Sequence, residues 1–326
     1  MRSSDAPGVH ALSRFWRRLF VFCVPLALAG TMTEFVLAQV PNSYSVKRDN
    51  LKALAGEVNT LIVGSSNAYY GISPEGLSGS AFNLANVNEG TYYHDKLLTD
   101  QLPNLPNLKR VIIGVSYITL FVQLTRGEIE DWRQYYYYQE WGIPPRSLVD
   151  RLDVRMWSRL ALSMPPFPMD SLRAGFQTMR TGVRSGTTPN LDSRGWWMSD
   201  VAGDVSERAT GWALTRHHGM MHESYVADSV GDLEHLLSLL DQRNVEKILV
   251  TPPVWHTYAD GMRADTWDRV SGIYERLARE HRGRYLCFLR TPQLPAEDFY
   301  DPDHLNSRGA VHFTAMLEAA LERPQP

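Results

Sequence analysis

The sequence predicts an α/β fold whose parallel sheet is built from strand–helix–strand units. Short apolar segments with the character of buried strands occur at residues 60–64, 110–115 and 246–251. Segments with apolar residues at helical spacing separate these strands, and this alternation is typical of a parallel sheet. The chain has 326 residues, which is enough for a full hydrophobic core in one large domain or two small ones.

The first 40 residues predict a polar tail followed by a membrane-directed segment. Residues 1–14 are polar and are expected to be disordered. We assign residues 1–18 to a cytoplasmic tail and residues 19–40 to a signal anchor or a cleaved signal peptide. Three arginines at the end of the tail are expected to stay in the cytoplasm, so the body of the protein would be exported.

The two interpretations of this segment give two locations. The sequence Val36-Leu-Ala38 is a poor cleavage site, which favours an anchor. An anchored chain would be a single-pass protein of the cell inner membrane with its body in the periplasm, whereas a cleaved chain would be secreted. A buried core helix is a third interpretation, against which the neighbouring arginines argue.

Composition and charge exclude several classes of function. The formal net charge is −3 and there is no long basic run, so we expect no nucleic-acid partner. Cys23 lies in the apolar segment and Cys287 in a predicted strand, so neither a disulfide nor a cysteine metal site is expected. His217 and His218 lack a matched carboxylate or cysteine spacing, so we predict no metal. No glycine pattern suits a nucleotide, and no cofactor is predicted.

The segment from residue 43 to residue 115 predicts two helices and three strands. Apolar residues at helical spacing place the first helix within residues 43–58. Strand 60–64 follows, then a strand at 81–85, a helix at 91–102 and the buried strand at 110–115.

The domain that we assign to residues 41–326 is interrupted by an insertion at about residues 121–228. More than 100 residues separate two core strands here, which is too long for a simple crossover. We predict a mostly helical insertion that covers the carboxyl edge of the sheet. Its many tyrosines and tryptophans have two interpretations: a lid on which sugar rings stack, or a small core of the insertion itself.

After the insertion, the alternation of helices and strands returns. An amphipathic helix begins near residue 230, and the last predicted helix has Asn306 or Ser307 as its cap. The elements between them are the strand at 246–251, a helix at 266–281 and a strand at 284–289.

The loop that follows strand 246–251 is expected to face the functional site, because it leaves the carboxyl end of a parallel strand. Within it, Trp255, His256 and Tyr258 are predicted substrate contacts. His256 has two further interpretations, an ordinary loop histidine and a second candidate for a catalytic base.

The candidate nucleophile is Ser66, just past the carboxyl end of the first strand. Gly64 supplies a turn between the apolar residues 61–63 and this serine. Far downstream, Asp301 and His304 could supply the orienting carboxylate and the base that a serine nucleophile needs. The competing interpretation is that Ser66 merely caps a helix.

These residues resemble the SGNH/GDSL hydrolase superfamily. Its Gly-Asp-Ser block stands here as Gly64-Ser65-Ser66, and its Asp-x-x-His block stands as Asp301-Pro-Asp-His304. The sequence pattern Gly-Ser-Ser-x-Ala-Tyr-Tyr-Gly-Ile-x-Pro, which ends at Pro74, looks like that of a membrane-anchored bacterial branch of this superfamily. The resemblance covers about residues 60–115 and 245–320. It implies a three-layer, flavodoxin-like α/β/α sandwich and acyl-ester chemistry on Ser66, His304 and Asp301.

Two further blocks of that superfamily are altered in this chain. Asn88 stands where the resemblance places a glycine whose backbone N–H lines the oxyanion hole, and Gly90 is an alternative donor. Ser116 stands where it places an asparagine side-chain donor. The resemblance therefore implies oxyanion contacts from Ser66, Asn88 or Gly90, and Ser116, with Asn67 as a substrate contact.

We therefore predict an exported serine esterase or O-acyltransferase that acts on acyl esters, acetyl esters by analogy, of a cell-surface glycan. The alternative is a non-catalytic protein of the same fold that binds glycans or assists polysaccharide assembly. The predicted partners are the acylated glycan or another ester substrate, the inner membrane and a membrane-bound acyltransferase.

Overall fold

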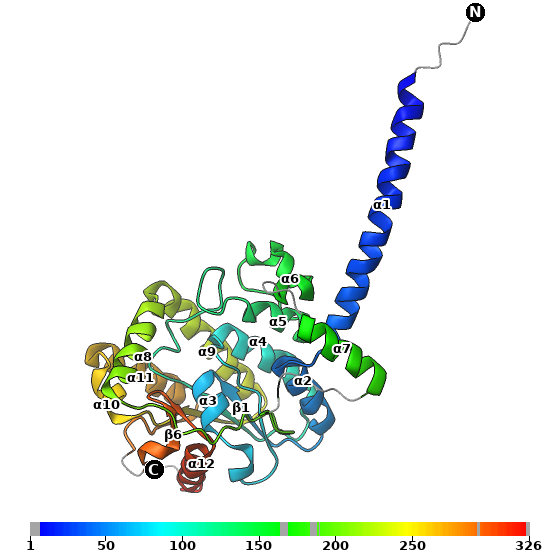
Figure 1. Ribbon diagram of the computed structural model, residues 1–326. Coiled ribbons are helices and arrows are strands. Elements are labelled where there is room, and N and C mark those ends of the chain that lie inside the picture. Colours follow the sequence, from blue (N-terminus) through cyan, green and yellow to red (C-terminus); the bar gives the residue numbers. More distant parts are fainter. Residues whose placement is uncertain (1–6, 164–168, 183–187, 189, 292–293, 324–326) are drawn as a thin grey trace, which may run out of the picture. The chain divides into compact units, whose positions relative to one another are not determined.

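The computed structural model describes residues 7–163, 169–182, 188, 190–291 and 294–323 (Figure 1). The chain divides into two compact units. The first comprises Met1–Asn42 and Asp153–Thr187, and the second comprises Ser43–Leu152 and Thr188–Pro326.

A five-stranded parallel sheet forms the centre of the second unit, which confirms the predicted α/β class. The strand order is β2-β1-β3-β4-β5, and every neighbouring pair is parallel. The strands are β1 (Thr60–Gly64), β2 (Ala81–Asn83), β3 (Arg110–Gly114), β4 (Glu246–Thr251) and β5 (Arg284–Cys287).

Helices and one small hairpin complete the second unit (Figure 1). The hairpin consists of β6 (Phe299–Asp301) and β7 (His304–Leu305). The helices are α2 (Ser43–Leu54), α3 (Ser66–Gly71), α4 (Thr91–Gln101), α5 (Arg133–Trp141), α8 (Glu207–Met220), α9 (Val226–Gln242), α10 (His256–Gly261), α11 (Ala264–Glu280) and α12 (Ser307–Leu321).

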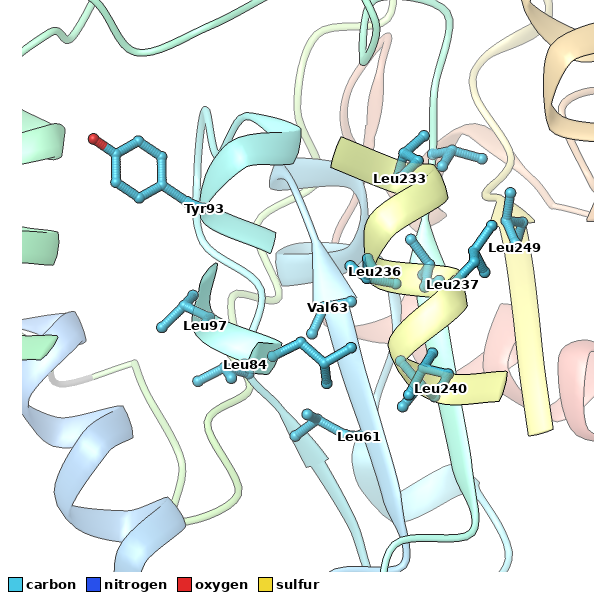
Figure 2. Packing of buried hydrophobic residues seen from close by; sticks show 14 of the residues in the cluster. Leu61, Val63, Leu84, Tyr93, Leu97, Leu233, Leu236, Leu237, Leu240 and Leu249 are labelled. Atoms are coloured by element: carbon cyan, nitrogen blue, oxygen red, sulfur yellow. The ribbon is translucent and has the colours of Figure 1, made fainter. Parts of the chain in front are cut away.

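Helices cover both faces of the sheet, because successive side chains of a strand point to opposite faces. Leu61 and Val63 of β1 pack in one hydrophobic cluster with α4 and with the leucines of α9 (Figure 2). Ile62 packs in the other cluster with α3 and with Phe313 and Leu317 of α12. Burying each leucine or isoleucine stabilises the fold by about 1.5–3 kcal/mol.

The carboxyl ends of β1 and β3 approach each other closely beneath α3. Gly64 and Gly114 are paired in the sheet, and Gly64 has a positive φ of 145°. A Cβ at Gly64 would lie 2.9 Å from the Cβ of Ala68 and 3.0 Å from the Cα of Gly114. Glycine is therefore required here for α3 to rest directly on the strand ends.

We expect Gly114→Ala to lower the free energy of unfolding by about 1–3 kcal/mol. The added Cβ would lie 2.6 Å from the Cβ of Ala68, so α3 would have to move away from the sheet. Denaturant unfolding followed by circular dichroism measures the change. Gly272→Ala is the matched control, because a Cβ there meets nothing within 4 Å and should stabilise α11 by about 0.5–1 kcal/mol. Equal losses at both positions would contradict the close approach.

One long helix in the first unit, α1 (Pro7–Leu37), contains the segment that the sequence analysis predicted to be a signal anchor or signal peptide. From Leu12 to Leu37 it is long and apolar enough for a membrane anchor or a signal sequence. The prediction of disorder for residues 1–14 was wrong for 7–14, which begin this helix, while residues 1–6 lie outside the described part. The helix can start at Pro7 because proline is tolerated in a first helical turn.

Glu34, which interrupts the apolar segment, has a structural partner in the same unit. Its carboxylate accepts hydrogen bonds from the backbone N–H groups of Arg159 (2.8 Å) and Leu160 (3.3 Å) and from the Ser158 hydroxyl. These donors lie at the start of α6 (Arg159–Ser163), where N–H groups have no partner within the helix. The carboxylate therefore caps α6.

The predicted insertion at about residues 121–228 is divided between the units, because residues 153–187 fall in the first. That part contains α6 and α7 (Met169–Thr181), whereas α5 and α8 belong to the second unit. Tyr135 and Tyr137 are fully buried, so they form core rather than an open sugar platform. Trp212 on α8 is exposed.

Candidate active site

Ser66 lies at the carboxyl edge of the sheet, directly after β1. It is the first residue of α3, and Ser65 is the N-cap. The chain places β2 on one side of β1 and β3 on the other, so the winding direction changes at this strand. Such a switch point is where open α/β sheets place their ligands.

A buried asparagine fixes the orientation of α3. The Asn83 amide at the end of β2 donates hydrogen bonds to the carbonyls of Ala68 (2.8 Å) and Ile72 (2.9 Å). Its side-chain oxygen accepts from the backbone N–H of Ala85 (3.0 Å). Because a buried amide is costly to leave unpaired, these bonds hold the helix that begins with Ser66.

The β6–β7 hairpin brings Asp301 and His304 together. The two residues are paired across its antiparallel strands, and Pro302 and Asp303 form the connection. The chain then enters α12 at Asn306, whose side chain accepts a hydrogen bond from the N–H of Gly309 (3.0 Å). This bond is one of the two helix caps that the sequence predicted, and it fixes where the hairpin ends.

Three side chains form a continuous chain of hydrogen bonds. The Oγ of Ser66 lies 2.8 Å from the Nε2 of His304. On the other side of the imidazole, Nδ1 lies 2.9 Å and 3.0 Å from the two carboxylate oxygens of Asp301. With the imidazole neutral, Nδ1–H donates to Asp301 and Nε2 accepts from the serine hydroxyl. The structure thus brings together Ser66, His304 and Asp301.

Asn67 links the serine turn to the hairpin. Its side-chain amide donates to the backbone carbonyl of Asp303 (2.9 Å). The two segments of the site are 236 residues apart in the sequence at this bond, so it fixes their register directly. Asn67 was predicted as a substrate contact, and the structure gives its amide this internal partner.

A second carboxylate approaches the imidazole of His304. The Oδ2 of Asp303 lies 3.4 Å from the Nδ1 of His304 and 3.4 Å from the Nε2 of His217 on α8. Its Oδ1 lies 3.6 Å from a guanidinium nitrogen of Arg216. The other ring nitrogen of His217 is paired with the hydroxyl of Tyr258. Two carboxylates, those of Asp301 and Asp303, therefore lie on the Nδ1 side of the imidazole, and Asp303 connects it to His217.

These neighbours shift the pKa values of the buried groups. Burial disfavours the charged form of His304, but the carboxylates of Asp303 and Asp301 outweigh burial and raise the pKa of the imidazole to about 9. Burial alone would raise the pKa of Asp301, but the positive charge of His304 lowers it below its usual value. Burial raises the pKa of Asp303. Burial and Arg216 lower the pKa of His217 to about 3, so this ring is neutral.

Aromatic rings pack around His304. The ring of Tyr70 lies edge-on to the imidazole at 5.1 Å between centroids, and it stacks on Tyr300 at 6.1 Å. Trp197 contacts both tyrosines. The indole N–H of Trp196 donates to the backbone carbonyl of Tyr70 (3.0 Å), which holds this wall in place.

In the part of the chain that the structure describes, Ser66 borders a small and a large cavity. The first, which we call the small cavity, has a volume of about 30 Å³, and its wall includes Ser116, Val122, Tyr258 and Met262. The second, which we call the wide cleft, has a volume of about 330 Å³. Its wall includes Tyr70, Arg133, Arg216, Met220, Tyr300 and His304.

Asn88 and Ser116 both share a cavity wall with Ser66, whereas Gly90 borders neither cavity. Asn88 has a positive φ of 54°, a conformation that favours glycine and that asparagine tolerates better than most residues. This explains why asparagine is tolerated in this backbone conformation. The Ser116 hydroxyl lies 3.0 Å from the Thr119 hydroxyl, and either group can be the donor.

The three residues predicted from the loop after β4 have different environments. Tyr258 is buried and lines the small cavity. Trp255 donates its backbone N–H to the carbonyl of Pro302 (2.9 Å) and packs on Phe299, so it supports the hairpin. His256 begins α10 with an exposed side chain, and neither cavity wall includes Trp255 or His256. The hydrogen bond to Ser66 therefore favours His304 as the base.

The same residues form a group that could surround a cation. One ligand atom each from Asp301, Asp303 and His304 lies within 4.8 Å of the others. The Nδ1 of His304, however, already pairs with Asp301, and Nε2 pairs with Ser66. The arrangement is thus accounted for by hydrogen bonding, in which each imidazole nitrogen has a partner.

Comparisons with known proteins give little that bears on this site. No protein-family model and no curated protein matches the chain. Among solved structures, it is similar to one described as "The structure of a putative platelet activating factor from Streptococcus pneumonia". The match has a TM-score of 0.40 and 11% sequence identity, and it covers 92% of this chain and 99% of the other. A similarity at this level carries no argument about function.

Proposed function

We propose that the protein is a serine esterase or O-acyltransferase of the SGNH/GDSL type, with Ser66, His304 and Asp301 as its catalytic residues. The observation that carries this proposal is the unbroken hydrogen-bond chain from Ser66 through His304 to Asp301 at an open edge of the sheet. A serine that only capped α3 would not need this partner, and Ser65 already holds the N-cap position.

The reaction follows from the geometry of the three side chains. His304 takes the proton of Ser66 while Oγ forms a bond to the acyl carbonyl carbon, and Asp301 stabilises the imidazolium. Collapse of the tetrahedral intermediate breaks the ester bond, and His304 returns the proton to the departing alcohol. Water or a sugar hydroxyl then takes the acyl group from Ser66 by the same steps in reverse. Water as acceptor gives hydrolysis, and a sugar hydroxyl gives transfer.

The negative oxygen of the intermediate needs hydrogen-bond donors beside Ser66. We propose the backbone N–H groups of Ser66 and Asn88 and the hydroxyl of Ser116 for this role, because all three residues line the small cavity. Losing one such donor typically reduces kcat by 10²–10³-fold, roughly 3–4 kcal/mol. The hydroxyl of Ser116 supplies a donor where the family pattern has an amide, so the oxyanion site keeps its polar character.

We propose acylated sugars of a cell-surface glycan as substrates, and the inner membrane as the location, with the body in the periplasm. The apolar helix α1 and the aromatic wall of Tyr70 and Tyr300 support this assignment. A membrane-bound acyltransferase is the proposed partner. The alternative is a non-catalytic glycan-binding protein, which the altered residues Asn88 and Ser116 favour.

Active-site labelling decides between these two functions. We expect a fluorophosphonate probe to modify Ser66 in the full-length protein, because its Oγ is hydrogen-bonded to a base and faces a cleft. Peptide mass spectrometry after labelling identifies the modified serine. Denatured protein is the control for chemical reactivity without a folded site. An intact protein that takes up no probe at Ser66 would be a binding protein, and the esterase proposal would be abandoned.

A further inference from the structure

Helix α7 carries a row of large apolar side chains that the described part of the chain leaves largely exposed. They recur every three or four positions and therefore lie along one face, which we call the apolar face: Met169, Leu172, Phe176 and Met179. Phe176 is 55% exposed, and only Leu172 of this set is partly buried. On a different side of α7, Gly175 and Thr178 are buried. A helix normally buries its apolar face, so this one is expected to have a partner.

The buried side of α7 packs against the last turn of α1 within the first unit (Figure 1). A Cβ added at Gly175 would lie 2.8 Å from Cγ1 of Val36, so glycine is needed for this close approach. Val36 is itself fully buried. In the same turn of α1, Glu34 caps α6. Both short helices are therefore attached to the carboxyl end of the apolar helix.

These contacts favour an α1 that is retained rather than cleaved as a signal peptide. Cleavage near Ala38 would remove the carboxylate of Glu34, which accepts the backbone N–H groups of Arg159 and Leu160. It would also remove the residue against which Gly175 packs. Because both attachments need the last turn of α1, this helix forms part of the folded first unit.

The length of α1 sets the depth at which α7 would lie in a membrane. A charged arginine such as Arg18 stays at one surface of the bilayer. At about 1.5 Å per residue, the roughly 18 residues from Arg18 to Val36 span roughly 27 Å. The hydrocarbon core of a bilayer is about 30 Å thick. Val36, and α7 with it, would therefore lie where the hydrocarbon meets the headgroups at the carboxyl end of α1.

Two arginines and a tryptophan suit that depth. Arg173 and Arg180 are exposed on α7 and lie beside its apolar face. Arg173 pairs with Asp170 at 2.9 Å, but both side chains are largely exposed, so this pair is weak. Trp157 is 65% exposed and lies just before α6, the helix that Glu34 caps. Arginine side chains reach from apolar surroundings to the headgroups, where tryptophan also concentrates.

We propose that α7 lies in the plane of the membrane interface, with its apolar face among the acyl chains and with Arg173 and Arg180 at anionic lipid headgroups. This inference rests on the proposed membrane location and is independent of the chemistry at Ser66. A single spanning helix can rotate about its own axis. A second contact with the same bilayer fixes that rotation, so the first unit is held in one orientation.

Quenchers placed in the lipid test this position. We use full-length protein, one copy per phosphatidylglycerol nanodisc, with a fluorescent label on Phe176→Cys and with Cys23 and Cys287 replaced by serine. A nitroxide near the top of the acyl chain should quench this label at least about twofold more strongly than a label on Gln177→Cys. Gln177 is the matched control, because it is exposed on the polar side of the same turn. Aqueous iodide should give the opposite order.

A second labelled position and a folding check support the reading. Met179→Cys lies on the apolar face and should be quenched like Phe176→Cys. Circular dichroism checks that each variant is folded. Labels on the apolar face that iodide quenches as strongly as the label on Gln177→Cys, without quenching by lipid nitroxides, would overturn the proposal.

The native cysteine of α1 separates failure of this surface from failure of the anchor. In Cys287→Ser protein, a label on Cys23 should be quenched by a nitroxide deep in the acyl chain, because Cys23 is exposed within the apolar helix. Quenching at Cys23 without quenching at Phe176→Cys would overturn the contact of α7 and leave the anchor. Absence of quenching at both positions would overturn the membrane location as well. Labelling of Ser66 by a fluorophosphonate tests the esterase proposal separately.

A second protein chain is the competing occupant of the apolar face. In nanodiscs that hold two copies, a protein contact would protect the label on Phe176→Cys from iodide and from lipid nitroxides alike. That outcome would overturn the proposal in favour of an interface between copies.

The lipid charge tests the two arginines. Replacing Arg173 and Arg180 together by glutamate should weaken the lipid quenching of Phe176→Cys more in phosphatidylglycerol than in phosphatidylcholine. Replacing both by lysine keeps the charge and should keep the quenching. Equal losses in the two lipids would overturn the assignment of these arginines to anionic headgroups.

Discussion

Replacing Ser66 by alanine is expected to reduce kcat/KM for p-nitrophenyl acetate by about 10³-fold or more. The substitution removes the only atom of this side chain that can form the acyl–enzyme bond, and it leaves His304 without the hydroxyl that it would deprotonate. The backbone of α3 should be unaffected, because Ser66 is the first helical residue and the N-cap is Ser65. Initial rates with purified variant and wild-type protein give the result.

The adjacent serine provides the matched control for this experiment. Ser65 has no side-chain cap hydrogen bond, so Ser65→Ala should remain folded and keep at least about a tenth of the wild-type rate. A Ser66→Ala variant as active as the Ser65→Ala variant would show that the ester is cleaved without a serine nucleophile. The catalytic assignment would then be lost, although the fold would stand.

The sequence predicted the sheet well because its strands are short, apolar and bounded by turns. β1 and β3 lie within one residue of their predicted positions, and β4 matches its prediction. Their side chains are buried on both faces of the sheet, so each strand has a nearly continuous apolar sequence, as at residues 60–64 and 246–251. Such a sequence predicts a buried strand directly. Strand β5 of the sheet is shorter than the predicted strand at 284–289 and ends at Cys287.

Other elements depend on contacts that a local pattern does not contain. The β6–β7 hairpin is too short to show an alternation of polar and apolar residues, and α12 begins shortly after it. The insertion is divided between two units, and in the first unit Gly175 in α7 packs closely against Val36 in α1. These residues are far apart in the sequence, and neither lies in a motif.

The sequence predicted the three hydrogen-bonded residues of the candidate site, but not the residues that surround them. The spacing of Asp301 and His304 within one loop was visible in the sequence, and the structure pairs them with Ser66. The roles of Asp303 and His217 were missed. Asp303 is adjacent to His304 in the motif, which is a usable signal, whereas His217 approaches only because α8 folds over the edge of the sheet.

The second large effect is expected for Asp301→Asn, with a loss in kcat/KM on the order of 10³–10⁴-fold. An asparagine can turn its NH₂ toward Nδ1 of His304, which stabilises the tautomer whose Nε2 carries the proton and cannot accept one from Ser66. It also removes the charge that stabilises the imidazolium. Steady-state rates with p-nitrophenyl acetate measure the loss, and Ser66→Ala supplies the background rate.

Asp303→Asn is the matched variant that separates orientation from charge. Asp303 lies farther from Nδ1 of His304, at 3.4 Å against 2.9 Å for Asp301, so its loss should leave the rate at high pH within about tenfold of wild type. The base must be neutral to act, so wild-type kcat/KM should rise with pH to a plateau. The midpoint of this rise should lie near the His304 pKa of about 9. Because the charge of Asp303 raises this pKa, replacing Asp303 by asparagine should move the midpoint of the pH–rate profile to lower pH.

The contradicting outcome is a midpoint that stays at the same pH in Asp303→Asn while Asp301→Asn loses activity. It would show that the charge of Asp303 does not affect the pKa of His304. The raised pKa of the base would then have to come from Asp301 alone, and the rate at neutral pH would be limited by the same carboxylate that orients the imidazole.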